Sequence, residues 1–389
     1  MKKTLIALAV LGAAAGVAHA QSNVTVYGII DTGYVKMTGK DAYMDENINS
    51  RVGFRGSEDL GNGLKAIFQL EKRFNVGDGT MKGVEWDGNA NIGLQSNTWG
   101  KIRFGRMNEL TTETLRKFDP FYQYGVGGML QSSLRSARIS NTARYDSPKW
   151  AGFSFGLSYS LGQGTGRDDA NWAGDGKHNH GSSYIKGTTE GVKRRDLSND
   201  GYALNLSYYN GPWMATANWS RLADSGDSYN WNAGVSYKFG GARVMLAYEQ
   251  TRDKLGYSGF DMNGGDSANI GRGESKWSGE PGMGSSKQQS VLLGLEWDIG
   301  PGQFDISAQY LKMDDYGAKS RRGPYNFDDE DKAWKASVGY TYNLSKRTSV
   351  YGMAAYLDMD GDVKKNTGLA GVYGRESVTA FQLGMTHKF

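Results

Sequence analysis

Apolar and polar residues alternate with period two along most of this chain. In the segment GFSFGLSYS, Phe153, Phe155 and Leu157 share one face with Tyr159, while serine and glycine occupy the other face. The segment WNAGVSYKF repeats the arrangement over residues 231–239. Because successive side chains of a strand point to opposite faces, this period indicates β-strands with one apolar and one polar face.

About sixteen such segments follow one another along the chain. We expect strands near residues 23–37, 47–57, 63–75, 84–96, 100–107, 140–148, 151–161, 200–211, 212–222, 229–239, 241–253, 286–299, 302–315, 330–344, 347–360 and 376–389. Their connections are alternately short turns and long polar loops. This alternation is typical of outer-membrane barrels, which have short periplasmic turns and longer external loops.

A soluble β-sandwich also alternates apolar and polar residues and is the alternative fold. The aromatic residues favour a membrane protein, since many stand beside the predicted short turns, among them Trp99, Trp150, Trp213 and Trp297. Such rings form the girdle of a transmembrane barrel at the membrane interface. We therefore predict an all-β fold, a 16-stranded antiparallel transmembrane β-barrel whose lumen is wide enough to hold water.

Composition agrees with this fold. The 389 residues have a mean hydropathy of −0.58, which argues against a bundle of membrane helices. The chain contains 56 glycines, 6 prolines and no cysteine, a composition that fits many turns and bent strands without disulfides. The 45 basic and 41 acidic residues nearly balance, so no nucleic-acid partner is indicated.

The first twenty residues contain the long apolar run of the chain, TLIALAVLGAAAGVA. Lys2 and Lys3 precede the run, and the small-residue site Ala18-His19-Ala20 follows it. This order is typical of a secretory signal peptide, and the run is short for a retained membrane anchor. We predict a cleaved signal peptide over residues 1–20 and an outer-membrane barrel over residues 21–389.

Several segments carry a family resemblance. SRVGFRGSEDLG (residues 50–61), NVTVYGIIDTGY (23–34), NTARYDSPKW (141–150) and the terminal Phe389 together resemble the general porins of the betaproteobacterial type. The resemblance implies a homotrimer in the bacterial outer membrane, in contact with its lipid and lipopolysaccharide. Each barrel would pass ions and small hydrophilic solutes by passive diffusion. Phe389 would be the residue read by the barrel-assembly machinery.

A wide lumen needs a constriction, and the loop near residues 107–140 is the candidate. The resemblance implies that this loop folds into the barrel at mid-height. Within it, TTETLRKF predicts a short helix capped by a threonine. We expect the loop acids Glu109, Glu113 and Asp119 to line the constriction; the alternative is that they are solvated loop charges.

Arginines are expected on the wall opposite the loop. Arg51 and Arg55 lie on the polar face of their predicted strand, and Arg73 and Arg144 lie on the polar faces of theirs. The alternation of strand faces breaks at Arg106, so it does not give the direction of this side chain. The resemblance assigns Arg106 to the lumen. Fixed charges on opposite sides of a narrow pore create a transverse field that favours polar solutes over apolar ones.

One segment departs from the family. Where relatives commonly carry a further pore arginine, WDGNANIGL has Gly88, with Asp87 beside it. We therefore predict only a weak anion preference. The alternative function is a substrate-selective channel, for which an aromatic slide along the lumen would be diagnostic. Phe121, Tyr122 and Tyr124 on the loop suggest one, although such residues more often anchor a loop to the wall.

A barrel enzyme is a third reading. Outside the signal peptide, the histidines are His178, His180 and His387, and none forms a serine–histidine pair on the predicted wall. We expect no catalytic residue, no metal site and no cofactor. The acidic runs FDDED (327–331) and DMDGD (358–362) leave open the alternative of surface divalent cations.

Overall fold

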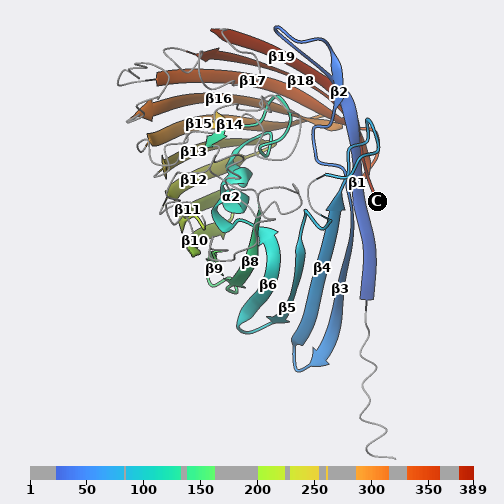
Figure 1. Cartoon of the computed structure of the whole chain (residues 1–389), viewed down its shortest axis with the longest axis vertical. Coiled ribbons are helices and arrows are strands. Elements are labelled where there is room, and N and C mark those ends of the chain that lie inside the picture. The colour runs from blue at the N-terminus through green and yellow to red at the C-terminus, as the bar shows by residue number, and fades with distance from the viewer. Residues whose placement is uncertain are drawn as a thin grey trace, which may run out of the picture.

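The structure is a computed structural model of the chain, shown in Figure 1. It describes residues 23–82, 85–132, 138–162, 200–223, 228–253, 260–261, 286–314, 331–359 and 376–389. The predicted signal peptide, the histidines 178 and 180, and most of the acidic runs 327–331 and 358–362 lie outside the described residues.

Long antiparallel strands make up most of the described chain. They are β1 (Asn23–Met37), β3 (Arg51–Gly61), β4 (Leu64–Arg73), β5 (Ala90–Ser96), β6 (Gly100–Asn108), β8 (Arg138–Asp146), β9 (Phe153–Ser160), β10 (Gly201–Asn210), β11 (Trp213–Arg221), β12 (Tyr229–Phe239), β13 (Ala242–Asp253), β15 (Ser286–Ile299), β16 (Gly302–Asp314), β17 (Asp331–Asn343), β18 (Thr348–Met359) and β19 (Ser377–Lys388).

These strands close into a ring. The sheet has 17 strands, one of which is the short side strand β2 (Tyr43–Asp45) on β1, so sixteen form the barrel. β1 closes the ring because residues 23–29 pair with β3 and residues 29–37 pair with β19. A closed sheet satisfies its backbone hydrogen bonds internally, as a lipid environment requires. The predicted 16-stranded antiparallel barrel is confirmed.

The strand register separates a lipid-facing surface from the lumen. On β19, Phe381, Leu383 and Met385 point outward and are about half exposed, whereas Gln382 and Thr386 point inward and are buried. Strands β10, β12 and β18 alternate in the same way. The predicted period-two faces are therefore confirmed, with the apolar face outside.

Two rows of aromatic rings border the outward face. Near the short turns, Trp213 packs on Tyr237 with ring centroids 4.6 Å apart. At the opposite ends of the strands, Trp231 packs on Tyr248 at 4.7 Å and Trp334 on Tyr356 at 5.2 Å. The predicted girdle thus has two levels, as expected where a barrel meets both membrane interfaces. Among the described residues no helix is long and apolar enough to cross a bilayer.

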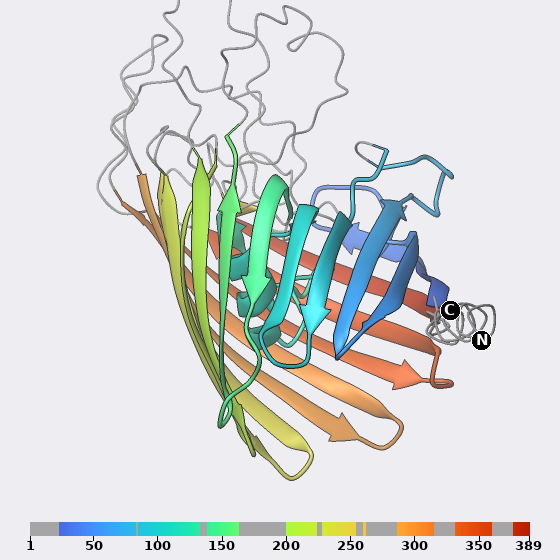
Figure 2. The same ribbon diagram turned by 90° about the horizontal axis from the view of Figure 1, so that it is seen from below.

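The short turns all lie at one end of the barrel, at the bottom of Figure 2. Asn62 and Gly63 alone join β3 to β4, and Gly300 and Pro301 join β15 to β16. Asn62, Gly63 and Gly300 have positive φ, between 53° and 75°, as tight hairpin turns require. We refer to this end as the periplasmic end and to the other as the extracellular end.

Smaller elements lie within the ring. Between β6 and β8 the chain forms helix α2 (Leu110–Leu115) and the 3₁₀ turn η1 (Arg116–Phe118), and α2 lies inside the barrel in Figure 1. The two-residue strand β7 (Gln131–Ser132) pairs with β14 (Phe260–Asp261). The loop predicted to fold into the lumen does so.

One predicted strand is too long. The segment expected at 84–96 forms β5 only from Ala90 onward. Before that point, the Asp87 carboxylate accepts the backbone N–H of Arg73 at 2.9 Å, and the N–H of Gly88 donates to the Glu71 carbonyl at 3.1 Å. These contacts replace regular strand pairing, and side-chain alternation could not reveal them.

Candidate pore constriction

The inner loop begins with a capped helix. The Glu109 carboxylate accepts the backbone N–H of Thr112 at 2.6 Å and the hydroxyl of Thr111 at 2.7 Å. Glu109 is therefore the N-cap of α2, and the predicted threonine cap is wrong. Glu113 lies in the first turn, where a carboxylate interacts favourably with the positive end of the helix dipole.

Asp119 organises the turn that follows the helix. Its carboxylate accepts backbone N–H groups from Phe121, Gln123 and Met129 at 2.8 to 3.1 Å. The side chain is fully buried, and this burial raises the pKa of Asp119. Three converging donors satisfy the carboxylate and hold the turn in one conformation, with Gln123 at a φ of 64°.

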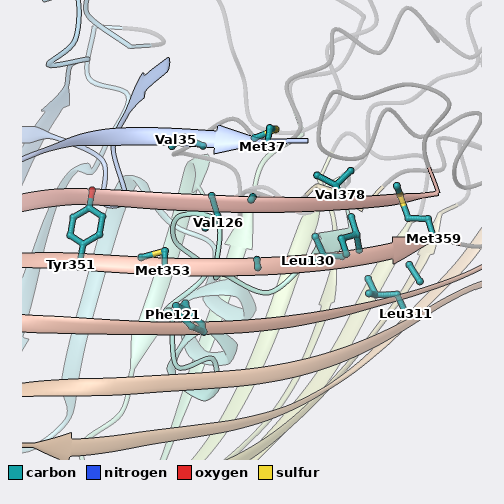
Figure 3. Packing of buried hydrophobic residues seen from close by; sticks show 14 residues of the cluster. Val35, Met37, Phe121, Val126, Leu130, Leu311, Tyr351, Met353, Met359 and Val378 are labelled. Carbon is teal, nitrogen blue, oxygen red and sulfur yellow. The ribbon is translucent and has the colours of Figure 1, made fainter. Parts of the chain in front are cut away.

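Apolar side chains attach the loop to two parts of the wall. Phe121, Val126 and Leu130 pack into a buried cluster with inward residues of β1 and β16–β19, as Figure 3 shows. Leu115 and Phe118 form a second cluster with residues of β13 and β15. Packed side chains thus fill the lumen on this side. The remaining part of the lumen is bordered by the arc of β3–β6 opposite the loop.

Polar contacts fix the loop at the same wall. The side-chain oxygens of Gln382 and Gln309 accept the backbone N–H groups of Val126 and Leu130 at 3.0 and 2.7 Å. The buried Lys335 ammonium donates to the carbonyl of Gly128. Since each side chain takes up a backbone group of the loop, the segment is buried without losing its hydrogen bonds.

Glycines on the wall leave space for the bulky side chains of the loop. A Cβ placed on Gly234 would lie 2.5 Å from the ring of Phe118, and one on Gly294 would lie 2.6 Å from Pro120. Gly339 faces Phe121 in the same way, at 2.9 Å. The high glycine content therefore serves the loop as well as the turns.

The opposite wall carries arginines. Arg51 and Arg73 are direct neighbours on the inward face of β3 and β4. The Glu71 carboxylate lies between them, 3.6 Å from an Arg51 nitrogen and 3.8 Å from the Arg73 Nε. Nearer the periplasmic end, the exposed Arg55 guanidinium lies over the Tyr27 ring, 5.1 Å from its centroid.

A second group of charges joins this wall to the loop. The Arg144 guanidinium contacts the Glu113 carboxylate of α2 at 2.6 Å and Asp146 at 2.7 Å. Arg103 reaches Asp146 at 2.8 Å. Burial opposes ionisation of Glu113, but the Arg144 guanidinium outweighs it and lowers the pKa of Glu113. Arg144 thus holds the helix to β8, and Arg103 ties β6 to β8 through the same Asp146 carboxylate.

Tyr124 brings the tip of the loop to the arginine wall. Its hydroxyl accepts from Arg116 at 3.2 Å and also has a hydrogen bond with Arg51. Burial alone would raise the pKa of Tyr124, but Arg116, Arg51 and Arg73 outweigh it, so the pKa is lowered. The loop therefore closes part of the lumen beside the arginines.

Carboxylates lie on the far side of the ring. Glu296 on β15 and Asp305 on β16 are direct neighbours on the inward face, and Arg243 donates to Glu296 at 3.1 Å. β4 and β15 are the third and twelfth strands of the sixteen, so these acids are nearly diametrically opposite the arginine wall. This arrangement can impose a field across the lumen.

Comparisons with known proteins agree with this geometry. The model of a protein family described as "Gram-negative porin" matches residues 7–362 of this chain. The chain belongs to the Gram-negative porin family. It is 32% identical to an outer membrane porin protein of Bordetella pertussis, over 92% of this chain and 94% of that one. It is 31% identical to outer membrane porin protein 32 of Delftia acidovorans, over the whole length of both chains.

A solved structure supports the fold of this porin. The anion-selective porin from Comamonas acidovorans superposes with a TM-score of 0.68 at 25% identity, over 95% of this chain and 100% of that one. The protein is an outer-membrane porin, a barrel that crosses the membrane many times and forms a channel for passive diffusion. The predicted family, location and channel function are confirmed.

Four of the predicted constriction residues are buried. Glu109, Asp119, Arg73 and Arg144 are 3%, 0%, 1% and 6% exposed. The two arginines keep their places on the inward face of the wall, whereas the two acids do not line the constriction as expected. The two acids are consumed in holding the backbone of the loop. Arg106 lies at a bulge between Gly105 and Met107, where it donates to the Asp87 carbonyl and the Ser140 hydroxyl.

The acids that oppose the arginines, Glu296 and Asp305, were not among the predicted constriction residues. Both residues lie on the inward faces of their strands, and this alternation was the available signal.

The aromatic residues of the loop do not form a slide, since they lie in different places. Phe121 is buried in the wall cluster, Tyr124 contacts arginines, and Tyr122 lies near Arg243 and Glu296.

Proposed function

We propose that this porin is a general diffusion channel with a weak preference for anions. The observation that carries the proposal is the excess of cations on the inward faces of β3–β8. The cations are Arg51, Arg55, Lys65, Arg73, Lys101, Arg103 and Arg144, against Asp59, Glu71, Asp146 and, from the loop, Glu113. The name of the anion-selective relative from Comamonas acidovorans supports the same sign.

The preference is weak because carboxylates partly offset the cations. Glu71 lies between Arg51 and Arg73, and Asp146 is shared by Arg103 and Arg144. Exposed charges are screened over about 8 Å at physiological ionic strength, so Arg55 acts mainly on ions that pass close to it. Gly88 adds no charge, and its Cβ position is 2.6 Å from Glu71 Oε1.

The proposal includes a homotrimer, and the outward face supports it. The extracellular aromatic row includes Tyr202, Trp219, Trp231, Tyr248, Tyr310, Trp334 and Tyr356, on β10–β13 and β16–β18. On β3, β4 and β5 the outward residues nearest that end are Val52, Lys72 and Ala90. An arc without interfacial rings suits contact with another subunit rather than lipid.

Further partners belong to the same proposal. Outward apolar residues would contact membrane lipid, and the extracellular rim would contact lipopolysaccharide. The exposed Phe389 at the end of β19 would be recognised by the barrel-assembly machinery. Membership of a family of channels supports the absence of catalytic activity and of a cofactor.

Zero-current potentials in planar bilayers test the proposal. Across a potassium chloride gradient, we expect conductance steps in multiples of three and a small potential of anion-favouring sign. Arg55→Gln should reduce this potential, because Arg55 is the exposed arginine of the wall. Arg347→Gln on the β17–β18 turn is the matched control and should leave the potential unchanged. A cation-favouring potential in the unmodified protein would overturn the assigned selectivity, and absence of conductance would overturn the open channel.

A further inference from the structure

A pocket of about 370 Å³ lies at the periplasmic end of β10–β13. Tyr209, Met214, Lys238 and Arg243 line it, and all four lie on the inward faces of their strands. Pro212 of the β10–β11 turn adds to its apolar part. The pocket therefore belongs to the periplasmic mouth of the lumen, away from the arginine wall of β3–β6, and has an apolar side and a charged side.

Two lysines from outside these strands reach the Tyr209 ring. Lys117 of η1 donates to the Tyr209 hydroxyl at 3.2 Å, and its ammonium lies 5.3 Å from the ring centroid. Lys149, in the exposed turn between β8 and β9, lies 5.1 Å from the same centroid. In the part of the chain that the structure describes, neither ammonium pairs with a carboxylate. An aromatic ring does not neutralise a cation, so both lysines keep their charge for an anion.

The two cations that line the pocket have carboxylate partners. Lys238 lies 3.6 Å from Asp298, and Arg243 lies 3.1 Å from Glu296. The side chains of Lys238 and Asp298 are 46% and 60% exposed, and exposed ion pairs contribute little to stability. Lys238 can therefore turn toward a bound anion at little cost, whereas Arg243 stays with Glu296. The surroundings of the pocket remain net positive after both acids are counted.

We infer that this pocket binds small aromatic carboxylates at the periplasmic mouth of the channel. The ring of the ligand packs against Tyr209, Pro212 and Met214, since aromatic rings pair favourably in offset or edge contacts. Its carboxylate accepts charge-assisted hydrogen bonds from Lys117 and Lys149. Small-molecule sites generally combine apolar walls with a few placed polar groups in this way.

Both sides of the pocket are needed to explain its composition. An inorganic anion would use the lysines but leave the apolar side empty. A neutral aromatic solute would fill the apolar side but leave the lysines without a counter-charge. The inference extends the proposed anion preference to a second part of the lumen, and it rests on that proposal only in requiring that solutes reach the mouth.

Calorimetric titration of the purified porin in detergent tests the assignment. The probe is benzoate, compared with acetate, which has the charge without the ring, and with benzyl alcohol, which has the ring without the charge. Titration into detergent micelles alone supplies the blank. The test variants are Lys149→Gln and Tyr209→Ser. The matched control, Lys346→Gln, removes an exposed cation from a different periplasmic turn.

We expect benzoate to bind more tightly than either acetate or benzyl alcohol. Lys149→Gln should weaken benzoate binding about tenfold, as loss of a hydrogen bond to a charged group typically does. Tyr209→Ser should bind benzoate no better than acetate, and Lys346→Gln should bind it like the unmodified protein. Equal affinity of the unmodified protein for benzoate and acetate, or no loss in Lys149→Gln, would overturn the assignment. The comparison of the three ligands needs no variant, so it decides even if Tyr209→Ser fails to fold.

Conductance of the same preparations separates this inference from the proposed channel. Lys149 lies in a turn away from the arginine wall, so Lys149→Gln should conduct normally even when benzoate binding is weakened. Benzoate binding without conductance would refute the diffusion channel and keep the pocket. Conductance without benzoate binding would refute the pocket and keep the channel.

Discussion

Gly28 and Phe389 join the two ends of the barrel chain. The N–H of Gly28 donates to the Phe389 carbonyl at 3.0 Å, and the N–H of Phe389 donates to the Gly28 carbonyl at 3.1 Å. The Phe389 ring also covers Gly28, since a Cβ there would lie 2.3 Å from its tip. The terminal residue is thus part of the seam that closes the ring.

Substitution Gly28→Val should weaken this seam. The added side chain would force the Phe389 ring off β1, and overpacking of this kind typically costs about 1–3 kcal/mol. We expect the variant to lose its folded, heat-modifiable gel mobility at a lower temperature than the unmodified protein. Ala336→Val, on the exposed outward face of β17, adds similar bulk without this contact and should leave the midpoint unchanged.

The barrel was predictable from the sequence because each strand has one face in lipid and one in water. In β19 this requirement alone determines the alternation from Phe381 to Met385. Strand ends were less predictable, since Gly61 extends β3 and Gly88 interrupts the expected start of β5. Both depend on contacts with neighbouring strands, which hydrophobic periodicity does not encode.

Gly234→Leu should displace the inner loop. The new side chain would occupy the space of the Phe118 ring, so η1 must move away from β12 toward the centre of the lumen. We expect a smaller single-channel conductance in potassium chloride. Val235→Leu changes the lipid-facing neighbour on the same strand and serves as control. Unchanged conductance in Gly234→Leu would show that the loop does not limit the current.

Low pH should release the contact between α2 and β8. The Arg144 guanidinium lowers the pKa of Glu113, so the ion pair stabilises the loop at neutral pH. A lowered folded-state pKa means that this contribution is complete above the ordinary glutamate value of about 4.3 and is lost as pH falls through the folded value. We expect brief closures of the channel to increase only below that ordinary value.

Glu113→Gln provides the comparison at neutral pH. The amide keeps the shape of the side chain but removes its charge, so closures should already be frequent at pH 7 and should change little on acidification. Single-channel recordings from pH 7 to pH 3 measure both proteins. Identical pH profiles for the two would show that another group controls the closures.

The constriction was only partly predictable. Strand parity placed Arg51, Arg55 and Arg144 on the inward face, as the register confirms. Parity has no meaning in an irregular loop, so it could not show that Glu109 caps a helix or that Asp119 binds three backbone amides. The sequence alone does not distinguish an acidic residue that stabilises a loop from one that lines a pore.

Phe121→Ala should loosen the loop without changing the charge of the pore. Phe121 packs among buried residues of the wall, and removal of a buried phenylalanine side chain typically costs about 3–5 kcal/mol. The hydrogen bonds from Val126 and Leu130 to wall glutamines remain, so the loop should stay inside the lumen but fluctuate. We expect larger open-channel current noise with an unchanged zero-current potential. Phe121→Leu refills most of the volume and should restore quiet currents. A shifted potential in Phe121→Ala would mean that the loop position, rather than the arginine wall alone, determines ion selectivity.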